Sequence, residues 1–198
     1  MSPKSSSQTK AASPAREVTL GERLGLSFVV GSASWRYVLA FGAPASVLLV
    51  AYYFPYAANS STANLLIGYL RAYARMAGVV LRLFEQNLAV RGQDIIGRYS
   101  LRIVRSCDAM DINILLTCAI MAWPCALRPR LIAAASAIVL LVVVNTIRIC
   151  TLYYLGLYAP SSFEFVHMEA WPIVILVIAV VLFLTFISKV RPHAAARS

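Results

Sequence analysis

The 198-residue chain is 60% hydrophobic and only 13% charged, whereas an ordinary soluble domain carries about 25% charged residues. This composition excludes a soluble globular fold and predicts a protein that folds in a lipid bilayer. The formal net charge of +10 does not indicate nucleic-acid binding, because the basic residues are scattered between apolar blocks rather than gathered on one polar domain.

The chain begins with a polar tail and then becomes strongly apolar. Residues 1–35 contain Ser, Lys, Pro and Glu without the apolar core of a signal peptide, so we predict a disordered cytoplasmic tail. Residues 36–190 form one predicted membrane domain, and residues 191–198 a second cytoplasmic tail. A helix needs about 20 apolar residues to cross the hydrocarbon core. Four runs approach or exceed this length, at residues 37–56, 110–127, 131–157 and 171–188.

The stretch from 65 to 84 has a helical pattern of a different kind. Arg71, Arg75 and Arg82 fall within a narrow stripe of one helix face, and a broad apolar face lies opposite. This pattern predicts an amphipathic helix that lies in the membrane interface, with its arginines reaching the headgroups.

The polar stretch from 85 to 106 precedes the second apolar run. Its side chains alternate in a strand-like way around Gly92 and Gly97, which predicts a small outer β-hairpin. The predicted fold class is therefore an all-α integral membrane protein with about four transmembrane helices, one interfacial helix and this hairpin.

The Lys and Arg residues that flank the apolar runs predict the orientation of the chain. They lie in the N-terminal tail, between the second and third runs, and after the fourth run, which places these three segments on the cytoplasmic side. The segments 57–63 and 158–170 carry no Lys or Arg and are placed outside. Four arginines would lie on the outer side, contrary to the usual excess of Lys and Arg on the cytoplasmic side: Arg91, Arg98, Arg102 and Arg105.

Three residues of catalytic type fall at the outer membrane level under this topology. Cys107 stands at the outer start of the second run, and His167 lies in the predicted outer loop before the fourth. Arg148 lies 18 residues beyond Arg130, which is about 27 Å along a helix. A thiol at a helix start near Arg and His is favoured as the thiolate nucleophile. The histidine would move the proton, and the arginine would hold a carbonyl or an oxyanion.

Each of these residues also has an ordinary structural interpretation. A cysteine at a helix start is usually inert, a loop histidine is usually a surface residue, and an arginine near a helix end often reaches to headgroups. The remaining cysteines, at 118, 125 and 150, are interpreted as small apolar residues. No CxxC pair and no His/Cys cluster with metal-ligand spacing occurs, so neither a metal nor a cofactor is predicted.

Two acids close to Cys107 have open roles. Asp108 is best interpreted as a helix cap. Asp111, one turn after Cys107, either caps the same helix, pairs with Arg148 or orients His167.

Three short segments, in this order, carry a family resemblance. They are VRSCDAM at 104–110, NTIRI at 145–149 and FEFVH at 163–167. Together they resemble the exosortase/archaeosortase family, and its short form called exosortase H most closely, over roughly residues 85–190.

The resemblance implies a membrane-embedded cysteine protease or transpeptidase without a metal or cofactor. Cys107 would be the nucleophile, Arg148 the arginine of the Asn-x-x-Arg motif and His167 the histidine, while Asn145 would hydrogen-bond the site. The substrate would be an exported protein with a C-terminal sorting signal, made of a short motif, one transmembrane helix and a basic cluster. The enzyme would be a multi-pass protein of the bacterial inner membrane with its site toward the periplasm.

One pair of residues departs from the family pattern. Asp108 and Ala109 stand where the family usually has a small polar residue followed by Gly. If that glycine allows the substrate backbone to approach closely, the methyl group of Ala109 narrows the space available to the substrate backbone.

Two other functions remain open at the level of sequence. A non-enzymatic scaffold or assembly factor would use the basic interfacial helix to hold anionic membrane lipid or a membrane partner, and would not need Cys107. A small transporter would use Arg148 to bind an anionic solute, but the chain shows no internal repeat.

Overall fold

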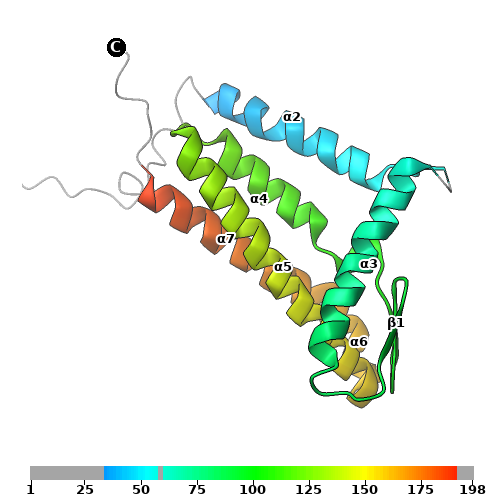
Figure 1. Cartoon of the computed structure of the whole chain (residues 1–198). Helices are drawn as coiled ribbons and strands as arrows, with labels where there is room; N and C mark the ends of the chain where they lie inside the picture. The colour runs from blue at the N-terminus through cyan, green and yellow to red at the C-terminus, as the bar shows by residue number, and fades with distance from the viewer. Residues whose placement is uncertain (1–33, 58–59, 191–198) are drawn as a thin grey trace, which may run out of the picture.

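The computed structural model describes residues 34–57 and 60–190. The predicted cytoplasmic tails therefore lie almost entirely outside the described residues. Four helices pack lengthwise into a bundle, and a fifth crosses one end of it beside a small sheet (Figure 1). The lengthwise helices are α2 (Ser34–Tyr53), α4 (Met110–Ala122), α5 (Leu127–Tyr158) and α7 (Trp171–Lys189). The fold is mostly helical, as predicted.

Within the described residues, three helical stretches are long and apolar enough to cross a membrane. They are Trp35–Tyr53, Leu127–Tyr158 and Pro160–Lys189. The second predicted span, at residues 110–127, is shorter than expected, because α4 has 13 residues and reaches only about 20 Å. Its end has a local cause: Trp123 precedes Pro124 and is extended at φ −63° and ψ 132°, since proline disfavours the helical conformation in the residue before it. Helix α4 nevertheless sits inside the bundle, in contact with α2, α5 and α7.

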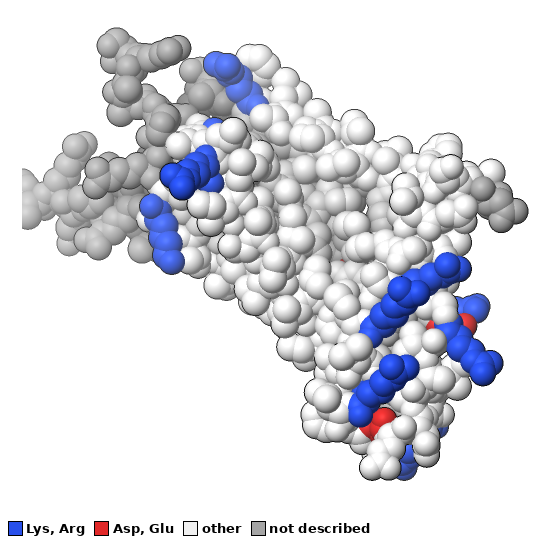
Figure 2. All heavy atoms as spheres, in the orientation of Figure 1, with Lys and Arg blue, Asp and Glu red and all other residues white. Residues whose placement is uncertain are grey.

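On the face that Figure 2 shows, the charged residues gather at the two ends of the bundle, and the broad surface between them is uncharged. Arg36 near the start of α2, Arg128 at the start of α5 and Lys189 at the end of α7 mark one end. The other end holds α3 and the sheet (Figure 1). An apolar belt between two charged rims is the surface that a bilayer-spanning protein presents.

The predicted amphipathic helix is α3 (Ser61–Leu81), which crosses the end of the bundle and packs on α5. Its arginines at 71, 75 and 82 are exposed, as the stripe predicted. The side chain of Ser60 caps the helix by accepting a hydrogen bond from the Ala63 N–H (3.1 Å). The buried face consists of Leu70, Tyr73, Ala74, Ala77, Gly78 and Leu81.

The predicted hairpin is a three-stranded antiparallel sheet in the order β1-β2-β3. Its strands are Ala89–Arg91, Asp94–Ile96 and Ser100–Arg102. Gly92 (φ +63°) opens the two-residue turn between β1 and β2, where a left-handed residue matches the twist of the strands.

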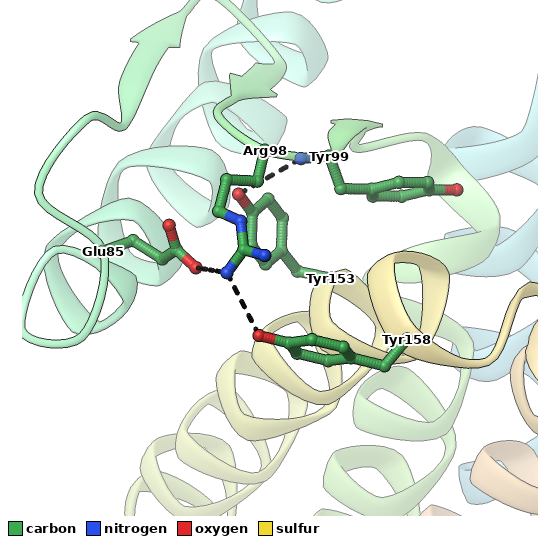
Figure 3. A network of polar contacts seen from close by, with 5 residues as sticks. All are labelled: Glu85, Arg98, Tyr99, Tyr153 and Tyr158. Atoms are coloured by element: carbon green, nitrogen blue, oxygen red, sulfur yellow. Dashed lines mark hydrogen bonds and ion pairs between the residues drawn. The ribbon is translucent and has the colours of Figure 1, made fainter.

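The turn between β2 and β3 fastens this sheet to α5 (Figure 3). The buried Tyr153 hydroxyl accepts a hydrogen bond from the Tyr99 N–H (3.4 Å). Arg98 donates to the Tyr158 hydroxyl (3.2 Å) and lies 3.8 Å from the Glu85 carboxylate. The sheet therefore holds a fixed position over the last turns of α5, directly before the segment that carries Cys107.

The predicted outer loop at 158–170 is helical instead. Helix α5 ends at Tyr158, only Ala159 interrupts the helices, and Pro160 opens α6 (Pro160–Phe165), since proline suits a first helical position. A π-helical turn, Val166–Ala170, then joins α6 to α7. Helix α5 also continues ten residues, about 15 Å, beyond Arg148. The residues of catalytic type are therefore enclosed between helices rather than displayed on a loop.

Candidate active site

Cys107 ends a 3₁₀ turn, Arg105–Cys107, that links β3 to α4. Its N–H donates to the Val104 carbonyl (2.8 Å), and the Asn145 side-chain amide donates to its carbonyl oxygen (2.9 Å). The residue is 5% exposed, and its Sγ lies 3.3 Å from the Nε2 of His167. A thiol and an imidazole at this distance can exchange a proton directly.

His167 lies in the π-helical turn, where the main-chain hydrogen bonds depart from the α-helical pattern. The Trp171 N–H bonds to the Val166 carbonyl, five residues back, rather than to the carbonyl of His167. The next residue, Pro172, has no N–H to offer. The carbonyl of His167 is thus released from the helix ladder, and an Arg148 Nη2 donates to it (3.2 Å). π-Helical turns are rare and occur frequently at functional sites.

Arg148 and Asn145 act from the same face of α5, because they stand three residues apart. Both are buried, at 3% and 0% exposure. Asn145 holds the main chain of Cys107, and Arg148 holds the main chain of His167. The Asn-x-x-Arg spacing therefore lets one helix fix the two segments that carry the thiol and the imidazole.

Asp108 has a structural role directly before α4, although Ala109, and not Asp108 as predicted, occupies the N-cap position of this helix. Its Oδ1 accepts a hydrogen bond from the Met110 N–H (3.0 Å) at the start of α4. Its Oδ2 accepts a short hydrogen bond from the Tyr52 hydroxyl. The carboxyl is 1% exposed, and burial raises its pKa above the usual value, although the hydrogen bonds from Tyr52 and Met110 oppose this effect. Arg105 also contacts Tyr52, by donating to its carbonyl oxygen (3.4 Å).

Ala109 adopts a left-handed conformation, φ 52° and ψ 29°. This conformation is strained for a residue with a Cβ and costs nothing for glycine. The structure thus gives a conformational reason for a glycine at this position, in addition to the close approach of substrate that the sequence suggested.

The remaining predicted site residue, Asp111, lies in the first turn of α4. Its Oδ1 accepts a hydrogen bond from the adjacent Ile112 N–H (2.9 Å), which is a local contact. Two residues outside the quoted segments belong to the site, Tyr52 and Pro172, and so does Phe163 of the FEFVH segment, whose ring centroid lies 5.6 Å from that of His167. Of these, Pro172 could have been found from the sequence, because it follows His167 by five residues and has no N–H to donate to the His167 carbonyl in a π-helical turn.

The other three cysteines have different surroundings. All four cysteines are free thiols, and the thiols of Cys125 and Cys150 each donate to a main-chain carbonyl, that of Ala126 and that of Ala77. Across residues 34–57 and 60–190, no group of three or more His, Cys, Asp or Glu side chains is arranged to hold a metal ion. Cys107 is the cysteine with an imidazole beside it in this part of the chain.

The arrangement has the parts of a thiol-based acyl-transfer site. The imidazole can take the thiol proton, and the buried guanidinium places a positive charge near both groups, where it can stabilise a developing oxyanion.

The family model described as transmembrane exosortase (Exosortase_EpsH) matches residues 18–186. Neither a curated protein nor a solved structure matched the chain.

Proposed function

The chain belongs to the transmembrane exosortase family, and from that premise we propose that it cleaves the C-terminal sorting signal of exported proteins through a thioester on Cys107. It would act as a membrane-embedded cysteine protease or transpeptidase. The observation that carries the proposal is the 3.3 Å approach of Cys107 Sγ to His167 Nε2. These residues are separated by 60 positions, and separate elements, fixed by Asn145 and Arg148, bring them together.

The first half of the reaction forms the thioester. His167 Nε2 takes the proton from Cys107 Sγ, and the thiolate attacks the carbonyl carbon of the scissile peptide bond. The charge of Arg148 stabilises the oxyanion of the tetrahedral intermediate. When the C–N bond breaks, His167 returns the proton to the leaving amine, and the substrate's C-terminal helix departs.

The second half releases the acyl group. An amine of the acceptor, or water, attacks the thioester carbonyl, and His167 takes the proton from this nucleophile. When the C–S bond breaks, the proton passes to Sγ and the thiol is restored. No metal or cofactor enters these steps.

The position of the site suits a substrate that is itself anchored in the membrane. The basic residues at the starts of α2 and α5 and at the end of α7 lie at the end of the bundle opposite the sheet (Figure 1). If these residues face the cytoplasm, Cys107 faces the periplasm of a bacterial inner membrane. A short motif directly before a C-terminal transmembrane helix would then arrive at the level of Cys107. Membrane lipid would surround the apolar belt and contact the arginines of α3.

The decisive experiment compares C-terminal processing of exported proteins that carry an apolar segment followed by a basic cluster. Cells would express wild-type protein, Cys107→Ala or Cys118→Ala, the last as a buried-thiol control. We expect Cys107→Ala alone to abolish processing, and wild-type protein to form a hydroxylamine-sensitive conjugate with its substrate. Unchanged processing with Cys107→Ala would refute the proposal and support a scaffold that does not use the thiol.

A further inference from the structure

A cavity of about 290 Å³ lies next to the candidate site, on the side of the apolar belt. Helices α2, α3, α4 and α5 all contribute to its walls. Two of its lining residues place the cavity close to the thiol. Met110 follows Cys107 by three residues, and Val142 precedes Asn145 by three residues, which is about one helical turn. Its walls also include Leu48, Tyr69, Tyr73 and Thr117.

Two residues that line this apolar cavity, Tyr73 and Asn113, each have a buried polar atom without a hydrogen-bond partner among the described residues: the Tyr73 hydroxyl and Asn113 Oδ1. Asn113 lines the cavity and is 8% exposed. Its side-chain nitrogen donates to the Ala109 carbonyl (3.2 Å), which fixes the orientation of the amide. Its Oδ1 is buried and accepts no hydrogen bond from any of the described residues. Such an acceptor is costly to leave unmatched at this depth.

We propose that this cavity receives the first turn of the substrate's transmembrane helix, and that Asn113 Oδ1 accepts a hydrogen bond from a main-chain N–H of that turn. The inference rests on the proposed function. The first four N–H groups of any helix lack a partner within the helix, and hydrocarbon offers none. A lipid acyl chain would fill the apolar walls but has no donor. An apolar helix that begins here supplies both the apolar side chains and the missing donor.

The placement also fits the order of the substrate's parts. Asn113 lies one turn into α4, about 5 Å along the axis from Met110. An extended chain advances about 3.3 Å per residue, so this distance corresponds to about one or two residues, and the cleaved bond would lie close to the start of the docked helix. The cavity thus accounts for a cleavage site directly before a transmembrane helix.

The test uses the purified exported protein whose shortening depends on Cys107, with enzyme variants in lipid nanodiscs. Thr117→Phe fills the cavity. Ala119→Phe is the matched control, because Ala119 lines another apolar hollow, formed by α2, α4 and α7. We expect Thr117→Phe to raise KM about tenfold, the effect of losing one side chain's packing, with kcat nearly unchanged, while Ala119→Phe leaves both near wild type.

The hydrogen bond is tested at Asn113 itself. Asn113→Leu keeps the branched shape of the side chain but removes both the acceptor and the amide donor to Ala109, and we expect it to raise KM about tenfold. Asn113→Asp, protonated in this apolar environment, retains a carbonyl oxygen and should restore most of the affinity. The rate at which a small haloacetamide alkylates Cys107 should be equal in all variants, which would show that the site itself is intact.

A crosslinking measurement separates the possible occupants. Benzoylphenylalanine at position 117, in a Cys107→Ala background, should crosslink to the first turn of the substrate helix, whereas the same group at position 119 should not. Crosslinks at 117 to lipid alone, or equal KM values for Thr117→Phe and Ala119→Phe, would overturn the docking site while leaving the thioester reaction standing. Processing that persists in Cys107→Ala would overturn the reaction instead.

Discussion

The hydrogen bond from Tyr52 to Asp108 joins the end of α2 to the segment that carries Cys107, and Tyr52→Phe removes it while keeping the ring. Both residues are buried, at 6% and 1% exposure, so water cannot replace the lost donor. Leaving a buried acceptor of this kind without a donor costs about 1–3 kcal/mol. For a chain of this length, each kcal/mol lowers the Tm by about 2–4 °C.

The loss of stability caused by Tyr52→Phe should depend on pH, and the pKa of Asp108 determines whether the loss grows or shrinks as the pH rises. Burial raises this pKa above its usual value, and the Tyr52 hydrogen bond lowers it, so Tyr52→Phe raises it further. A carboxyl whose pKa is higher in the folded state binds its proton more tightly there. Its contribution to stability is complete below the unfolded pKa of about 3.9 and is lost as the pH rises through the folded pKa. The destabilisation by Tyr52→Phe should therefore be largest at neutral pH and shrink as Asp108 becomes protonated.

Thermal unfolding in detergent, from about pH 4 to pH 8, tests both statements. Wild type, Tyr52→Phe, Asp108→Asn and the double variant form a cycle that isolates the pair. Asp108→Asn should remove the pH dependence of the Tyr52→Phe effect. The reasoning would be refuted if the loss of stability caused by Tyr52→Phe were constant over this pH range and additive with the loss caused by Asp108→Asn.

Substitutions at three further positions test the framework of the site. Gly156→Ala should lower the Tm and expose the sheet to proteolysis, because a Cβ at this position meets the ring of Tyr99, and overpacking of this kind costs about 1–3 kcal/mol. Pro172→Ala restores an N–H and should let the π-helical turn relax toward an α-helix, rotating His167 from the thiol, so kcat of processing falls with little change in KM. Ala109→Val should destabilise by about 2 kcal/mol or more through strain and overpacking. Ala109→Gly should stay within about 1 kcal/mol of wild type, because relief of strain is offset by chain entropy and a lost buried methyl group.

Matched controls make these outcomes specific. Pro160→Ala removes a proline from the first position of α6, where no helical hydrogen bond is affected, and should leave kcat unchanged. Gly68→Ala adds a Cβ where no atom lies within 4 Å and should be neutral or slightly stabilising. A Tm for Gly156→Ala equal to that of Gly68→Ala, or a normal kcat for Pro172→Ala, would contradict the roles assigned to Tyr99 and to the π-helical turn.

The membrane fold and the helix α3 were predictable because their signals are local. A run of 20 apolar residues or an arginine stripe at helical spacing needs no tertiary contact to be recognised. The length of α4 was predictable only in part: the apolar run continues to residue 127, but Pro124 ends the helix earlier. Proline chemistry decided this boundary against hydropathy.

The segment before α7 shows where sequence patterns lose their power. Residues 158–170 carry no Lys or Arg and were predicted as a loop, yet only Ala159 interrupts the helices. The helical conformation here depends on packing against α5 and the sheet, which no local pattern records. The thiol and imidazole were predicted to share a membrane depth, whereas their contact depends on a π-helical turn that hydropathy does not encode.

The buried polar groups of the site make sense as a set, although each alone would be costly inside a membrane protein. Pro172 and the π-helical turn release the carbonyl of His167, and Arg148 binds it. The carbonyl oxygen of Cys107, at the end of the 3₁₀ turn, accepts its hydrogen bond from the side chain of Asn145 and not from the main chain of the described residues. Each side chain of the Asn-x-x-Arg motif thus satisfies a main-chain oxygen that irregular backbone has exposed. The expense of burying an arginine at this depth is offset by the irregular backbone it stabilises, and that backbone is what brings the thiol and the imidazole together.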